Sequence, residues 1–198
     1  MLERPCIISC NNVTAYFKSI GEDSEKMEGI KEGLSPLYRL DKPVSGVMLF
    51  AGSSKDLVIT GKDYYLVCVG KTEGSGVMED LLYHDKRSNR VFPVKRMRKG
   101  VKEARLAYEG LAYSEADDLS FVKVSLDTGR THQIRCQFAS RKMPLAGDGK
   151  YGSRIKCDIA LICQEVRFIS EGREYKASVD LPDIYPWDLF KNGGSYGE

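Results

Sequence analysis

The chain has 198 residues, of which 42% are hydrophobic and 29% are charged, and these proportions exclude a disordered chain. The 30 Lys and Arg residues nearly balance the 28 Asp and Glu residues, for a net charge of +2. Overall charge therefore gives no argument for nucleic-acid binding, and such an argument must rest on local clustering. No apolar stretch reaches the roughly 20 residues that cross a bilayer, and the N-terminus lacks the apolar core of a secretory signal. We expect a cytoplasmic protein without a membrane segment.

The six cysteines are spread along the chain and form no C-x-x-C pair. Because the chain has only two His residues, no metal site is expected. A disulfide framework is not expected without a secretory signal. We interpret the cysteines as small buried thiols.

The first half of the chain predicts a loop followed by buried strands. Residues 21–36 are polar and lack periodicity, which indicates a loop with at most one helical turn. Short apolar runs predict strands at 47–51 and 64–69, and a turn is expected at 71–76. The mixed segment 104–113 fits a strand with Leu106, Tyr108 and Ala112 on one face.

The second half predicts one helix among further strands. Apolar and polar residues alternate over 119–126, as in a strand with one polar face. Ile134 and Phe138 lie at helical spacing and predict a helix within 131–142. Two more strands are expected at 158–169 and 173–181.

Many strands and few helices indicate an α+β fold built on a large, mostly antiparallel sheet with flanking helices and loops. Neither a repeat nor a clear domain boundary is visible, so we expect residues 1–198 to form one domain.

Two short segments carry polar residues next to predicted strands. YRLDKPVSG at 38–46 places Arg39 and Asp41 just before the strand at 47–51. An aspartate at such a point is often a cap or a structural ion pair. KDYYLVCVG at 62–70 carries two tyrosines, which usually pack in a core.

A third segment, DTGRTHQIR at 127–135, is denser in hydrogen-bond donors. Its Arg and backbone N–H groups, at a turn that leads into a helix, suit a phosphate or a carboxylate. A solvated start of a surface helix is the alternative. MPLAGDGKYG follows it at 143–152.

Residues 86–105 concentrate positive charge, because Glu103 is their only acid. A polyanion partner would explain the cluster, and a solvated basic loop is the alternative. The basic residues are Lys86, Arg87, Arg90, Lys95, Arg96, Arg98, Lys99, Lys102 and Arg105.

Together these segments resemble the RluA-type pseudouridine synthase family. YRLDKPVSGVMLFA is similar to the family signature HRLDxxTSGLLLLA, and KDYYLVCVG is similar to KxYxAxVxG. TGRTHQIRCQFASRKMPLAGDGKYG follows the pattern TGRTHQIRVHLxxxGHPIxGDxxYG without a gap. The resemblance runs from about residue 36 to the end of the chain.

The resemblance implies the pseudouridine synthase fold and an enzyme that isomerises uridine in ribosomal or transfer RNA without cofactor or metal. Asp41 matches the catalytic aspartate, which acts on the ribose as nucleophile at C1′ or as base at C2′. Tyr64, rather than Tyr65, matches the tyrosine that stacks on the base and assists proton transfer. Arg135 matches the arginine that pairs with the aspartate, and Arg39 matches the one that fills the space left by the flipped base.

The implied partner is RNA with a uridine in a structured loop, where extruding a base costs least. We expect its contacts at Arg39, at four residues of the segment 86–105 and at three residues of the segment 127–135. These are Lys95, Arg96, Arg98 and Lys99, and Arg130, His132 and Gln133.

The chain departs from the family at Tyr38, where His is usual, and at Val44, where Thr is usual. The connection between Phe50 and Lys62 is shorter than in typical members, which carry a helix there. We expect a trimmed catalytic domain, without an added N-terminal RNA-binding domain, that acts as a monomer. A non-catalytic RNA-binding relative and an unrelated metal-dependent phosphate-ester enzyme are the alternatives.

Overall fold

A computed structural model describes residues 4–52 and 56–191, which form two compact units. The first unit holds the residues up to Tyr64 together with Ile162–Leu181. The second holds Tyr65–Leu161 and the residues from Pro182 onward. That residues 1–198 act as one catalytic domain stays a prediction.

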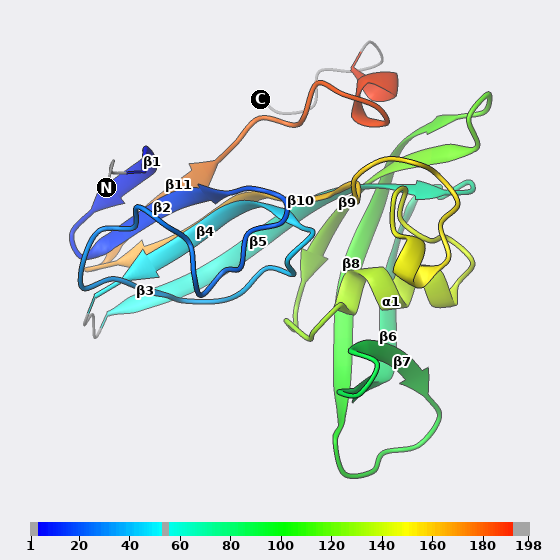
Figure 1. Ribbon diagram of the computed structural model, residues 1–198, viewed down its shortest axis with the longest axis horizontal. Helices are drawn as coiled ribbons and strands as arrows, with labels where there is room; N and C mark the ends of the chain where they lie inside the picture. Colours follow the sequence, from blue (N-terminus) through cyan, green and yellow to red (C-terminus); the bar gives the residue numbers. More distant parts are fainter. Residues whose placement is uncertain (1–3, 53–55, 192–198) are drawn as a thin grey trace. The chain divides into compact units, whose positions relative to one another are not determined.

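The first unit is built from strands in the order β1-β2-β4-β10-β5, with β3 added to β4 and β11 to β10 (Figure 1). β4 and β10 run parallel, whereas β1–β2, β2–β4 and β10–β11 are antiparallel. The strands are β1 (Cys6–Cys10), β2 (Val13–Lys18), β3 (Ser35–Pro36), β4 (Ser45–Ala51), the first part of β5 (Leu57–Val69), nearly all of β10 (Leu161–Ser170), and β11 (Arg173–Ser178).

β4 forms the centre of the first unit. All seven of its residues, SGVMLFA, are buried, because β2 and β10 flank it and its apolar side chains fill both faces of the sheet. The strands predicted at 47–51 and 64–69 are confirmed, and β5 begins earlier, at Leu57. The shortened connection before it includes residues 53–55, which lie outside the described residues.

The second unit continues β5 and adds strands in the order β5-β9-β8-β6-β7. Its helix α1 (Gln133–Ser140) buries Ile134 and Phe138, as the helical spacing predicts. The remaining elements are β6 (Ser75–Asp85), β7 (Arg90–Val94), β8 (Val101–Ser114), β9 (Leu119–Leu126) and the 3-10 helices η1 (Gly149–Tyr151) and η2 (Trp187–Phe190). Mixed strand directions and few helices confirm the predicted α+β class.

Some details of the predicted elements are wrong. The register of β8 shifts between Gly110 and Ala112, and such a bulge reverses the alternation of side chains. Ala112 therefore lies on the opposite face from Leu106 and Tyr108. Residues 21–36 form the expected loop, but with turns and β3 in place of a helical turn. β10 begins three residues later than the predicted strand at 158–169.

Candidate active site

The turn that carries Asp41 lies directly before β4. The Val44 amide donates to the Asp41 carbonyl oxygen at 2.9 Å and closes the turn. Leu40, the residue before the turn, is buried. The Ser24 hydroxyl donates to the Leu40 carbonyl at 2.9 Å and accepts from its amide at 3.0 Å. Asp41 itself is half-buried, so the backbone of this segment is held while the aspartate stays partly open to solvent.

Lys18, at the end of β2, holds the same turn from within the first unit. Its Nζ donates to the carbonyl oxygens of Val44 at 2.7 Å, Lys42 at 3.1 Å, Ser19 at 3.1 Å and Asp41 at 3.3 Å. The residue is fully buried, and burial lowers the pKa of its ammonium group. The sequence does not single out Lys18 as a site residue, because a lysine that ends an apolar strand usually extends into water.

Tyr64 lies on β5 and is buried, as is Cys163 on β10, while Tyr38 and Lys62 are half-buried. The Tyr38 hydroxyl donates to the Val47 carbonyl oxygen at 2.7 Å. The Lys62 ammonium lies 4.4 Å from the centre of the Tyr38 ring, a cation–π distance. Burial raises the pKa of Tyr64 well above its usual value, and Cys163, Tyr38 and Asp41 act in the same direction. Tyr64 is therefore a neutral phenol at pH 7. That Tyr64 and Asp41 act in one site stays a prediction.

Tyr65 belongs to the opposite face of β5, because neighbouring strand residues alternate. Its ring stacks on Phe121 with 5.5 Å between the ring centres. This contact favours core packing for Tyr65 and agrees with the choice of Tyr64 as the active-site tyrosine.

In the second unit, the turn before α1 is held by Gln133. Its side-chain oxygen accepts from the Thr128 hydroxyl at 2.8 Å and from the Arg130 amide at 2.9 Å, and its Nε2 donates to the Arg105 carbonyl at 3.0 Å. Gln133 is 3% exposed. With both ends of its amide used inside the fold, Gln133 is better suited to shaping the turn than to contacting RNA.

Arg135 forms a buried ion pair with Asp148. Its Nε and Nη2 donate to the two carboxylate oxygens at 2.7 and 2.9 Å, and the two side chains are 3% and 0% exposed. The guanidinium also lies 5.2 Å from the centre of the Tyr151 ring. Asp148 was missed as a site residue, although it lies in the segment 143–152 that the sequence singles out. The predicted pairing of Arg135 with Asp41 joins the two units and stays a prediction.

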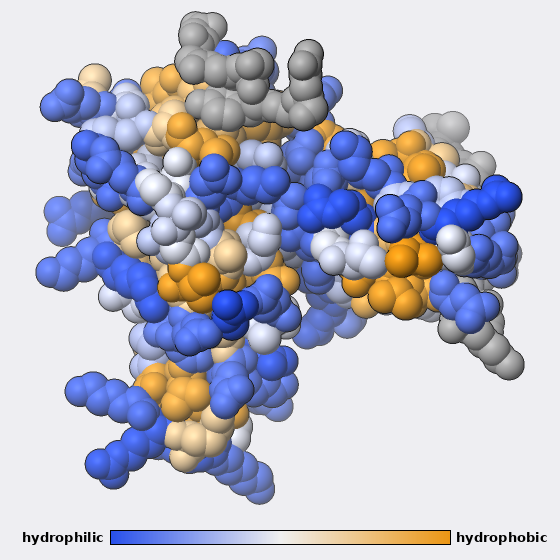
Figure 2. Space-filling model, turned by 180° about the vertical axis from the view of Figure 1, so that it is seen from behind, coloured by the Kyte–Doolittle hydropathy of each residue, from blue (hydrophilic) through white to orange (hydrophobic). Residues whose placement is uncertain are grey.

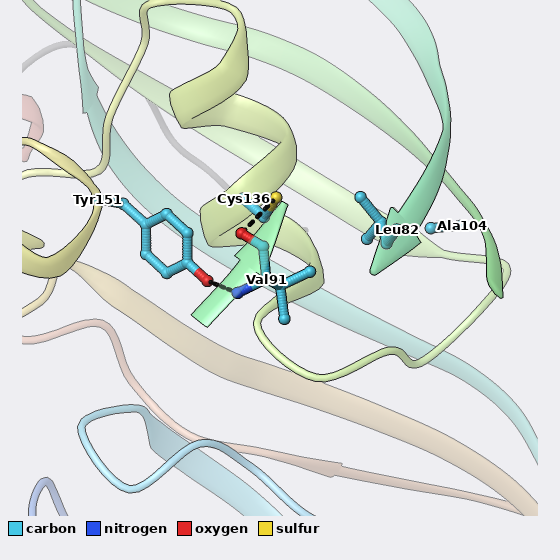
Figure 3. Close-up of a cluster of buried hydrophobic side chains, with 5 residues drawn as sticks. All are labelled: Leu82, Val91, Ala104, Cys136 and Tyr151. Atoms are coloured by element: carbon cyan, nitrogen blue, oxygen red, sulfur yellow. Dashed lines mark hydrogen bonds between the residues drawn. The ribbon is translucent and has the colours of Figure 1, made fainter. Parts of the chain in front are cut away.

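His132 is buried at the start of α1, in a left-handed backbone conformation with φ of 49°. Its Nδ1 lies 3.0 Å from the Tyr151 hydroxyl, which also accepts from the Val91 amide at 2.9 Å. Figure 3 shows that Val91 in turn accepts a hydrogen bond from the Cys136 thiol on α1. Tyr151 thus connects β7 to the start of α1. His132 is the residue of α1's start that Tyr151 contacts.

The residues 86–105, here called the basic arm, include β7, the loop after it and the start of β8. Two large apolar side chains are exposed on it, Phe92 at 40% and Met97 at 55%. Figure 2 shows hydrophilic side chains projecting around a small hydrophobic area at this end of the unit. The predicted RNA-binding residues of the loop are all exposed: Lys95, Arg96, Arg98 and Lys99.

The two remaining predicted RNA contacts are accessible arginines. Arg39 lies 67% exposed and pairs with Glu25 at 3.3 Å, an exposed ion pair that contributes little to stability. Arg130 is half-buried, and its Nε donates to the Glu103 carbonyl at 2.9 Å. Arg39 therefore remains able to turn toward a ligand.

Within residues 4–52 and 56–191, no three His, Cys, Asp or Glu side chains gather as metal ligands would. No helix in the same described ranges has the length and apolar character needed to cross a membrane.

Comparison with known proteins points to one family. The family profile described as RNA pseudouridylate synthase matches residues 11–140. The chain is 29% identical over 198 residues to tRNA pseudouridine synthase C of Vibrio parahaemolyticus, covering 80% of this chain and 79% of that protein. It is 36% identical over 129 residues to ribosomal large subunit pseudouridine synthase D of Nitrosomonas europaea, covering 59% of this chain and 35% of that one.

Solved structures agree on the fold. The human RNA pseudouridylate synthase domain containing 1 superposes with a TM-score of 0.74 at 16% identity, covering 90% of this chain and 84% of that one. At this identity the likeness bears on the fold alone.

Proposed function

The chain belongs to the RNA pseudouridylate synthase family, of the RluA type, and is therefore an isomerase; from this premise we propose that it converts a specific uridine of ribosomal or transfer RNA through Asp41. The observation that carries the proposal is the Asp41 turn, which lies within the matched residues 11–140 and directly before the buried strand β4. In the reaction, the bond from N1 of uracil to C1′ breaks and the bond from C5 to C1′ forms. The proton on C5 leaves, and N1 carries a proton in the product.

Asp41 acts on the ribose as an ionised carboxylate, either as nucleophile at C1′ or as base at C2′. We propose that Arg135 supplies the cation that pairs with Asp41, as the family resemblance implies. Asp148 holds the Arg135 guanidinium in one plane through two hydrogen bonds. A fixed guanidinium next to a carboxylate favours the ionised form that either role requires.

Tyr64 acts mainly through its ring. Since its pKa is raised well above the usual value, its hydroxyl stays protonated at neutral pH and is a poor general base. Stacking on the turned uracil uses the aromatic face and needs no ionisation.

The RNA is held by the basic arm on the phosphates around the target loop, with Arg39 and Arg130 as further contacts. The enzyme is proposed to work on a flipped uridine, as a cytoplasmic monomer. A non-catalytic RNA-binding relative would need the basic arm but not Asp41, Tyr64 and Arg135 together, which favours the enzyme.

The test is pseudouridine mapping on total RNA from cells with and without the gene, followed by rescue with wild type, Asp41→Asn and the exposed-site control Asp180→Asn. One site should lose pseudouridine, and wild type and the control should restore it while Asp41→Asn does not. If no site changes, or if Asp41→Asn restores it equally well, the proposal is wrong and the binding protein becomes the better interpretation.

A further inference from the structure

We propose that Arg90, at the start of β7, binds one phosphate group of the RNA through the forked edge of its guanidinium. The inference rests on the proposed function, because it takes RNA as the substrate. It gives a distinct role to one basic residue of the arm, which the sequence does not separate from the others.

Arg90 differs from the other basic residues of the basic arm in its surroundings. The others are all exposed, whereas Arg90 is half-buried. Its Cζ lies 5.5 Å from the centre of the Phe92 ring and 5.3 Å from the centre of the Tyr151 ring, and both are cation–π distances. A guanidinium that stacks on rings keeps its N–H donors at its edge. The two rings therefore hold the Arg90 side chain while its edge stays available for hydrogen bonds.

The Arg90 guanidinium has no counter-charge in the part of the chain that the structure describes. Its Nε is buried without a hydrogen-bond partner, and its side chain forms no ion pair with residues 4–52 or 56–191. Asp85 on β6 is its register partner. The Asp85 carboxylate instead accepts from the Arg87 amide at 3.0 Å and from the Ser88 hydroxyl at 2.7 Å, within the turn. A held guanidinium with unused donors is suited to an acceptor from outside the chain.

The Tyr151 ring allows a comparison, because a second guanidinium lies against it. The Arg135 Cζ is 5.2 Å from the ring centre, but Asp148 takes its donors and its side chain is 3% exposed. Arg90 has the same aromatic neighbour, a greater exposure and no carboxylate partner among the described residues. The fold supplies the anion for Arg135, and for Arg90 the anion has to come from a ligand.

The charge around Arg90 favours a phosphate as that anion. Lys86 and Arg87 lie exposed in the turn just before β7, and clustered positive charge attracts a polyanion. Two oxygens of a phosphate match the two parallel donors at the edge of a guanidinium. The edge of a guanine offers a similar pair of acceptors, but it has no negative charge to balance that of Arg90.

The experiment measures the RNA affinity of wild type, Arg90→Gln and Arg90→Lys at several salt concentrations, with the mapped RNA as the probe. Arg87→Gln is the control, because it removes an exposed arginine of the same arm. Arg90→Gln should weaken binding at least about tenfold and lower the salt slope by about 0.7 to 0.9. Arg90→Lys should keep the slope but lose about threefold or more in affinity, because it retains the charge without the fork. Arg87→Gln should weaken binding less than about fivefold.

Phosphate ethylation interference gives a readout that a purely structural role of Arg90 would not move. Wild type should show one phosphate whose ethylation blocks binding. That effect should disappear in Arg90→Gln and persist in Arg87→Gln. An unchanged interference pattern or wild-type affinity in folded Arg90→Gln overturns the proposal. The same holds if Arg90→Gln abolishes interference by N7 methylation of a guanine instead of a phosphate effect. If Arg90→Gln does not fold, wild-type affinity in Arg90→Lys overturns the forked contact.

The two proposals fail separately, because binding and interference require no catalysis. If wild type forms no pseudouridine, or Asp41→Asn matches wild type, the proposed function fails. Binding to a hairpin RNA with a uridine in its loop then still tests Arg90. If wild type is active and Arg90→Gln binds RNA as wild type does, only the inference about Arg90 fails.

Discussion

At the scale of single residues, Arg135 and Asp148 form a buried ion pair in the second unit. Both side chains are almost fully buried and joined by two short hydrogen bonds. Replacing Asp148 by Asn keeps the shape but leaves a buried guanidinium without this counter-charge. We expect the free energy of unfolding to fall by about 3 kcal/mol or more, measured by urea unfolding at pH 7. Asp158→Asn changes an exposed aspartate and serves as the control. A loss for Asp148→Asn no larger than that of the control would contradict the assigned strength of the pair.

At the scale of elements, the parallel contact of β4 with β10 depends on a glycine. A Cβ at Gly46 would lie 2.3 Å from the Cys163 carbonyl oxygen, and the residue has φ of +129°. Because backbone atoms on two paired strands cannot move aside, Gly46→Ala should destabilise the protein by more than about 3 kcal/mol or prevent folding. Gly172 also has positive φ, but no atom lies within 4 Å of its added Cβ. Gly172→Ala should cost only about 1 kcal/mol, so the difference between their thermal unfolding curves isolates the clash. Similar losses of stability for both variants would contradict the predicted clash at Gly46.

The basic arm yields a second prediction at this scale. If its loop residues contact phosphates, each contact adds about 0.7 to 0.9 to the slope of log affinity against log salt concentration. Neutralising Lys95, Arg96, Arg98 and Lys99 together should therefore flatten the slope measured by RNA binding at several salt concentrations. A matched variant removes four exposed basic residues of the first unit and should keep the slope: Lys26, Lys31, Arg173 and Lys176. An unchanged slope in the arm variant would remove the arm from the RNA contact surface.

At the scale of the whole molecule, buried thiols and phenols set the behaviour at alkaline pH. Burial raises the pKa of Cys68 and Cys136 to about 11 and that of Cys163 and Tyr151 to about 12. These groups keep their protons in the folded state at a pH where the unfolded chain releases them. The stability that they contribute is complete below the ordinary pKa, about 8.5 for the thiols and about 10 for the phenol, and is lost as the pH rises from there to the folded-state pKa.

We therefore expect the free energy of unfolding to fall from about pH 9 toward pH 12, by about 1.4 kcal/mol per pH unit for each proton retained. Urea unfolding at a series of pH values measures this loss. Cys163→Ala removes one such group and should give a shallower decline than wild type. A stability that is constant over this range, or a Cys163→Ala curve parallel to wild type, would contradict the prediction.

The sequence by itself determined several of the elements and the family, but it did not reveal β1, β2, β6 and β7. β4, β9 and α1 follow from hydrophobic periodicity, which depends only on residues close together in the chain. The family motifs are contiguous, so the enzyme class and the candidates Asp41, Tyr64 and Arg135 can be read from local strings of residues. The roles of these candidates stay predictions, because no local string reveals what surrounds a side chain.

Only the tertiary structure decided which polar groups are buried and with what partners. Lys18 reaches carbonyls 23 to 26 residues away, and Arg135 meets Asp148 across 13 residues. Gln133 likewise bonds a carbonyl 28 residues distant. Lysine, aspartate and glutamine are usually exposed, so composition and spacing favour solvent for all of them. Burying these polar groups is favourable only when distant segments bring matching donors and acceptors to them, and that match exists only in the folded chain.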